Sequence, residues 1–172
     1  MDSLHLKFKE IPIDGDIDDF INKMEQNGFS KKSQFDCGHI MTGRFANRNC
    51  EAYVFYTLKT KRVCRLCIYA PEQNSWFSLK SDYEDLKKQF QIKYGKPSSE
   101  YSFFVEPYFE GDGYELQALS SEKCFYSSYW DKPEGIISVS ISQFSQLCFS
   151  YDDHLNVELD NKEKQANILD EI

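Results

Sequence analysis

The apolar residues of the segment 16–28 recur at intervals of three and four positions. This spacing puts them on one side of an α-helix, and the first turn is acidic, which the helix dipole favours. Gly28 supplies the left-handed residue that commonly ends a helix. The pattern therefore predicts an amphipathic helix whose buried side consists of Ile17, Phe20, Ile21 and Met24.

A second helix is predicted from residue 79 to Gly95, because its apolar residues also share one side and Pro97 follows the glycine. Ser81 and Glu84 have the spacing of a capping box and are expected at its start. The buried side of this helix is expected to consist of Leu79, Tyr83, Leu86, Phe90 and Tyr94.

The remaining segments alternate apolar and polar residues between turn-forming residues, as half-buried strands do. A short irregular piece is expected at 114–120, turns at 111–113 and 131–135, and a polar helix at 158–170. Strands are predicted near residues 35–46, 50–59, 62–70, 100–109, 122–131, 135–142 and 145–152.

A helix followed by antiparallel strands occurs twice, over residues 11–71 and 79–152. Hairpins combined with two helices predict an α+β fold, in which both helices cover one face of an antiparallel sheet and a further helix closes the chain. No linker rich in proline, glycine or serine separates the two segments, so residues 1–172 are expected to form a single domain. The two segments are candidates for a structural repeat.

Several short motifs resemble those of one protein family. The most specific is the opening at Leu6–Gly15, with its Ile-Pro-Ile-Asp-Gly run, and the others are Lys93–Pro97, Gly111–Glu115 and Tyr151–Asn156. Over nearly its whole length the chain is similar to a family of small, uncharacterised α+β proteins of Bacteroides-type bacteria. The resemblance implies the fold, and in many similar proteins the opening directly follows an export signal. It brings no known activity, so no catalytic residue follows from it.

The composition excludes two classes of protein. Of 172 residues, 41% are hydrophobic and 16% are aromatic, which is enough to build a core and excludes a disordered chain. No apolar run approaches the roughly 18 residues of a membrane helix. Residues 1–5 lack the basic start and apolar stretch of a secretion signal, so a cytoplasmic location is expected, with export left open if the natural start differs.

The net charge of −8 is uneven along the chain. Acidic residues are concentrated in residues 1–30 and 151–172, whereas the centre is close to neutral. Phosphate backbones repel such ends, so a nucleic-acid partner is not expected. The sequence contains no phosphate-binding loop or other motif that requires a cofactor, so none is expected.

Three groups of residues offer chemistry, and each has a plainer interpretation. Cys64 and Cys67 have the spacing of a metal or redox pair, but on a strand they point to opposite faces, so free thiols are expected. Cys37 and His39 share one face of a strand, which leaves open an enzyme with an unrecognised nucleophile and base. The third group is Asp14, Asp16 and Asp18. These acidic residues are expected to cap a helix, and a cation-binding module stays open as an alternative.

The aromatic content is the remaining signal. Tyrosine and tryptophan on an open sheet face offer flat, amphipathic contact area at a low cost in side-chain entropy. We therefore expect a non-catalytic binding or protein-interaction module, of which an acidic inhibitor or immunity-type protein is one form. Its partner is a protein or small ligand on the sheet face, the oligomeric state stays open, and the expected binding residues are Tyr108, Tyr126, Tyr129 and Trp130.

Overall fold

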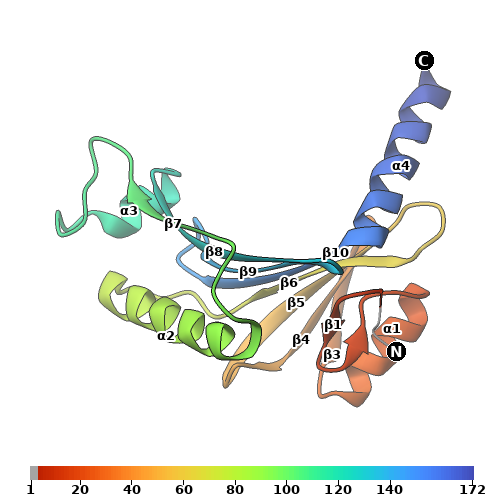
Figure 1. Ribbon diagram of the computed structural model, residues 1–172, viewed down its shortest axis with the longest axis horizontal. Helices are drawn as coiled ribbons and strands as arrows, with labels where there is room; N and C mark the ends of the chain where they lie inside the picture. Colours follow the sequence, from red (N-terminus) through yellow and green to blue (C-terminus); the bar gives the residue numbers. More distant parts are fainter. Residues whose placement is uncertain (1–3) are drawn as a thin grey trace. The chain divides into compact units, whose positions relative to one another are not determined.

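A computed structural model describes residues 4–172, and it confirms the α+β class. The large sheet is antiparallel and has eight strands, which are hydrogen-bonded in the order β3-β4-β5-β6-β10-β9-β8-β7 (Figure 1). Its strands are β3 Ser30–Phe35, β4 Gly38–Phe45, β5 Arg48–Tyr56, β6 Val63–Tyr69, β7 Ser99–Phe104, β8 Cys124–Lys132, β9 Gly135–Ile141 and β10 Leu147–Asp153. A small sheet pairs β1 Lys7–Phe8 with β2 Ile11–Pro12. The helices are α1 Ile17–Gln26, α2 Trp76–Tyr94, α3 Glu115–Ser120 and α4 His154–Glu171.

The chain forms two compact units. Unit 1 contains the chain up to Ile68 together with Lys132–Ile136 and Ser150–Ile172, and unit 2 contains Tyr69–Asp131 and Ile137–Phe149. Residues 132–136 and 150–152, which lie inside the predicted segment 79–152, belong to unit 1.

In unit 1, α1 confirms the first predicted helix. Asp16 has an extended backbone and its carboxylate accepts a hydrogen bond from the backbone N–H of Asp18, which caps the helix start. The expected apolar side is buried in full, and the rings of Phe8, Phe29, Phe45 and Tyr151 complete this core. The sequence analysis missed β1, β2 and β3; every residue of β3 is exposed, so it shows no alternation to detect.

In unit 2, α2 packs its aromatic rings against β7, β8 and β10 and begins earlier than predicted. Ser75 is its cap, because the backbone of Ser75 is extended and its hydroxyl accepts a hydrogen bond from the N–H of Ser78. Ser81 therefore lies inside the helix, and the capping box with Glu84 was wrong. Leu79 and Tyr83 are fully buried, whereas the other three predicted residues are half-buried.

Two further elements differ from the expectation. Residues 114–120, expected to be irregular, contain α3. The last helix begins at His154 rather than near residue 158, because the Asp153 carboxylate accepts a hydrogen bond from the N–H of Asn156 and caps it.

Candidate functional site

The outer face of β7 and β8 carries a row of aromatic rings, which we call the aromatic ladder: Tyr101, Phe103, Phe125 and Tyr129. The register places Phe103 directly opposite Phe125, with ring centroids 5.1 Å apart. The rings of Tyr101 and Tyr129 meet edge to face at 6.1 Å. The exposed fractions of Tyr101, Phe103 and Phe125 are 50%, 47% and 40%. Such rings offer a partner apolar area that folding itself leaves unburied.

The neighbouring residues on the same two strands point to the opposite face, where α2 covers them. Trp76 of α2 contacts Phe104 of β7 and Tyr126 of β8, with centroids 5.7 Å and 5.1 Å apart. The hydroxyl groups of Tyr83 and Ser128 lie 2.7 Å apart and form a buried hydrogen bond. The helix therefore covers one face of these strands and leaves the ladder on the other.

β7 is also the edge of the sheet. It pairs with β8 along all six of its residues without a register shift, and no strand lies on its other side within residues 4–172. An unpaired edge presents backbone N–H and C=O groups that can bind an added strand. The ladder and this edge belong to the same strand.

An aromatic pocket follows β7 along the chain. Asp112 organises its loop, because the carboxylate accepts the backbone N–H groups of Phe109 and Tyr114 at 3.1 Å and 2.7 Å. Gly111 and Gly113 have positive φ angles, which let the chain turn sharply on both sides of Asp112. The cavity measures about 490 Å³ and is lined by Pro107, Tyr108, Phe109, Gly111, Asp112, Tyr114 and Gln117.

The structure separates the four predicted binding residues. Tyr126 and Trp130 are only 4% and 2% exposed, since both lie under α2, and the expectation that they line an open face was wrong. The indole N–H of Trp130 donates to the Gly95 carbonyl at 2.8 Å, and burial raises the pKa of Tyr126 well above its usual value. Tyr129 lies in the ladder and Tyr108 lies in the aromatic pocket, both half-buried.

The sequence analysis did not select Tyr101, Phe103 and Phe125 as site residues. The alternation along β8 shows two faces, one with Phe125 and Tyr129 and the other with Tyr126 and Trp130. Both faces are aromatic, so the pattern alone could not tell which one α2 covers. The register between β7 and β8 is the missing information, because it aligns Phe103 with Phe125.

The arrangement of Cys37 and His39 does not support a nucleophile and its base. Cys37 occupies the turn before β4 with a φ of 61°, whereas His39 is buried in β4 beside the Tyr56 ring, 6.0 Å between centroids. No hydrogen bond joins the two side chains in the described part of the chain, and burial lowers the pKa of His39. No disulfide bond joins the cysteines of residues 4–172. Burial raises the pKa of Cys64 to about 12, which makes it a poor nucleophile at neutral pH.

The carboxylates of Asp14 and Asp16 already have partners in unit 1. Asp16 caps α1, and Asp14 accepts a hydrogen bond from the Asn156 amide at 2.9 Å and forms an ion pair with Arg62 at 3.5 Å. Burial acts to raise the pKa of Asp14, but the Asn156 and Gly15 hydrogen bonds and the nearby charges hold it below its usual value. Within residues 4–172, no three His, Cys, Asp or Glu side chains are placed to hold a metal ion, so the geometry gives no support to a cation site.

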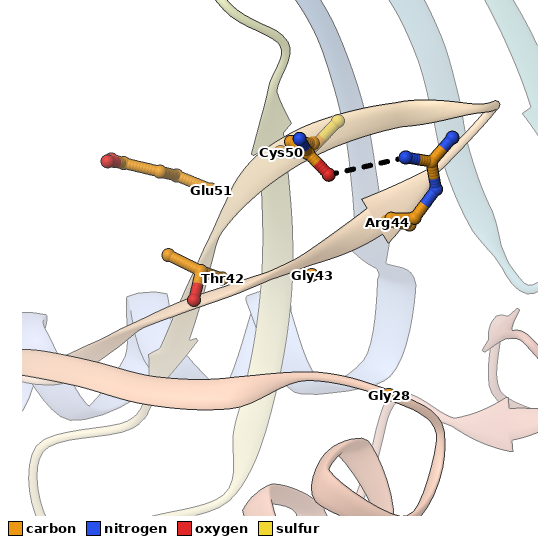
Figure 2. Close-up of a pocket in the computed structure, with 7 residues that line it drawn as sticks. Gly28, Thr42, Gly43, Arg44, Cys50 and Glu51 are labelled. Carbon is orange, nitrogen blue, oxygen red and sulfur yellow. Dashed lines mark hydrogen bonds between the residues drawn. The ribbon is translucent and has the colours of Figure 1, made fainter.

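A second pocket, of about 460 Å³, lies in unit 1 (Figure 2). The guanidinium of Arg44, labelled in Figure 2, donates a hydrogen bond to the side-chain oxygen of Asn49 at 3.5 Å. Arg44 also donates to the Asn47 carbonyl at 3.1 Å, and Glu51 forms an ion pair with Lys32. Both charged side chains that line this pocket, Arg44 and Glu51, therefore already have partners within unit 1. The aromatic ladder of unit 2, in contrast, leaves its rings half-exposed.

Comparisons with known proteins do not add to this geometry: no family model, curated protein or solved structure matches the chain. The resemblance to the Bacteroides-type family stays a prediction. None of the helices in residues 4–172 is both long and apolar enough to cross a membrane.

Proposed function

We propose that this protein is a non-catalytic binding module that engages a protein partner through the aromatic ladder and the free edge of β7. The observation that carries the proposal is the half-exposed state of three large rings on neighbouring strands. Scattered apolar residues are normal on a protein surface, but a contiguous group of rings beside an open sheet edge is typical of an interaction site.

The size of the ladder favours strand addition over docking on side chains alone. Half-exposed rings of this kind offer roughly 300 Å² of apolar surface together. A stable interface buries about 800 Å² on each partner, so the ladder supplies only its centre. Backbone pairing along β7 would extend the contact, with the rings as the residues that contribute most to affinity.

The charge around the ladder favours a basic partner. Residues 98–131, which contain the ladder and the aromatic pocket, include seven acidic residues and one basic residue, Lys123. Two of these acids, Glu100 and Glu110, form ion pairs with Lys87 and Lys80 of α2, so the remaining excess is five acidic residues to one basic. Charge complementarity of this kind accelerates association and selects partners of opposite sign. An acidic inhibitor or immunity-type protein that covers a basic surface is the specific form of binding module that these charges fit.

The test is recovery of a partner from an extract of the cells that produce the protein. Tagged wild-type chain is compared with the double variant Tyr101→Ser/Phe103→Ser and with Phe77→Ser, a matched control whose ring is 83% exposed on α2 of the same unit. The wild type and the control should recover the same protein, and the double variant should recover about tenfold less or lower, as expected when two central rings are lost. Equal recovery by all three proteins would rule out the ladder as the binding surface.

A further inference from the structure

The aromatic pocket combines rings with a carboxylate. Phe109 and Tyr114 are 63% and 61% exposed, and together with Tyr108 they line the same cavity as Asp112. The face of an aromatic ring carries negative potential and attracts a cation, most strongly when a carboxylate lies nearby to pair with it.

Hydrogen-bond acceptors remain available in the pocket. Each oxygen of Asp112 accepts one backbone N–H, and an ionised carboxylate has about four acceptor positions. The Gln117 amide nitrogen donates to the Tyr108 hydroxyl at 3.1 Å, which leaves the amide oxygen of Gln117 as an acceptor. The polar groups of the pocket therefore suit a ligand that donates several hydrogen bonds at once.

Among residues 4–172, no basic side chain lines this pocket. The nearby acid Glu110 is paired with Lys80, but no basic side chain in the described part of the chain forms an ion pair with Asp112. No lysine or arginine lines the cavity, and the segment that forms it is rich in acidic residues. The pocket thus combines aromatic walls with a carboxylate that has no basic partner among the described residues.

We propose that this pocket receives an arginine side chain of the partner protein. A guanidinium is planar, so it stacks on aromatic rings, and its five N–H donors can reach Asp112 and Gln117 together. Lysine carries the same charge but lacks the flat surface and the forked donors. The inference rests on the proposed function, since it specifies what the partner places beside β7.

The experiment is a titration of the full-length, ¹⁵N-labelled protein with N-acetyl-arginine amide at low ionic strength, followed by NMR. The matched ligand is N-acetyl-citrulline amide, which has nearly the same shape and no charge. The arginine derivative should bind with a dissociation constant of about 1 mM, as expected for a ligand of this size, and should shift the amides of Gly111 and Gly113. The citrulline derivative should bind at least about tenfold more weakly, because the ion pair and the cation–π contacts are lost.

Two variants locate the site. Tyr114→Ala removes an exposed ring and should weaken arginine binding about fivefold, whereas Phe144→Ala, a ring of equal exposure to Phe109 in the turn before β10, should bind as the wild type does. Equal binding of arginine and citrulline, an absence of saturable shifts, or unchanged binding by Tyr114→Ala would each overturn the arginine site.

The result of the arginine titration can be distinguished from the result of the partner-recovery experiment. If recovery depends on Tyr101 and Phe103 but the arginine derivative does not bind, the binding module stands and the arginine pocket is wrong. If the arginine derivative binds in the pocket and recovery is insensitive to both rings, the ladder is wrong, and the partner's arginine would have to be presented by another surface.

Discussion

The two edge strands of the eight-stranded sheet, β3 and β7, differ in the residues that they expose and in the regularity of their pairing. β3 carries Lys31 and Lys32, and its register with β4 shifts between Lys31 and Ser33. Charges and bulges on an edge strand prevent other strands from pairing with it. β7 has no register shift, its only charged residue is Glu100, which forms an ion pair with Lys87 of α2, and its outward residues include Tyr101 and Phe103. The difference is the one expected if β7 is the binding edge that we propose.

The rings of the two edges also have different roles. Phe35, at the end of β3, folds across Gly38 of β4 and contacts Phe55 edge to face at 5.5 Å. A Cβ at Gly38 would lie only 1.9 Å from the Phe35 ring, so the glycine makes room for this packing. The ring of Phe35 therefore packs within its own unit, whereas Tyr101 and Phe103 of β7 face outward.

The largest expected effect is the difference in stability loss between substitutions on the two faces of β8. Trp130→Ala should destabilise the protein by about 3–5 kcal/mol, because it empties a buried site under α2. Phe125→Ala, on the ladder face of the same strand, should cost less than about 1.5 kcal/mol, since its ring is 40% exposed. Urea denaturation followed by circular dichroism measures both, and equal losses would mean that the ladder belongs to the core.

A smaller loss of stability is expected at the β3 edge. Gly38→Ala should destabilise by about 1–3 kcal/mol, because the new methyl group displaces the Phe35 ring. In the double variant Phe35→Ala/Gly38→Ala the clash is absent, so the glycine substitution should cost much less there in a double-mutant cycle. If the two effects simply add, Phe35 is not held over Gly38 and the contrast between the edges weakens.

A lysine placed on β7, like those on β3, should weaken partner binding and leave the stability of the fold nearly unchanged. Phe103→Lys places one charge on the open edge and should weaken partner binding about tenfold or more. Its stability should stay within about 0.5 kcal/mol of the wild type, because the ring is half-exposed. Binding is compared with Gln34→Lys on β3, which should bind normally; a loss in both variants would point to a general charge effect.

The smallest expected effect is a change in the pH dependence of stability, which comes from a polar contact of unit 1 and has no counterpart in the aromatic contacts of unit 2. Glu163 of α4 accepts hydrogen bonds from the Lys59 and Thr60 N–H groups and from the Thr60 hydroxyl. Burial acts to raise the pKa of Glu163, but these hydrogen bonds outweigh it and leave the pKa below its usual 4.5.

A carboxyl group whose folded pKa is lowered stabilises the fold above its unfolded pKa, and this contribution is lost as the pH falls through the folded value. The wild type should therefore lose about 1 kcal/mol more stability than Glu163→Gln when the pH falls from 6 to below 4. Denaturation at a series of pH values measures the difference, and parallel curves for the two proteins would contradict the role of the ionised carboxylate.

Much of the fold could be predicted because its signals are local. The spacing of Ile17, Phe20, Ile21 and Met24 is sufficient to identify α1, and the stop at Gly95 correctly ends α2. The missed elements lack such signals: β3 is exposed at every position, and β1 and β2 have two residues each. The start of α2 depends on the conformation of Ser75, which its sequence neighbourhood does not fix.

The site was predictable only in part. Tyr108 and Tyr129 lie at the surface features that we propose for binding, whereas Tyr126 and Trp130 lie beneath α2. The pairing of Phe103 with Phe125 joins residues that are far apart in the chain, so no local pattern reveals it.

The sequence by itself determined that β8 has two aromatic faces, because successive side chains of a strand point to opposite sides. Only the tertiary structure decided which face became interior. The choice was made by the packing of Trp76, Tyr83 and Phe90 against that strand, and side chains from a separate helix are long-range partners that alternation cannot encode.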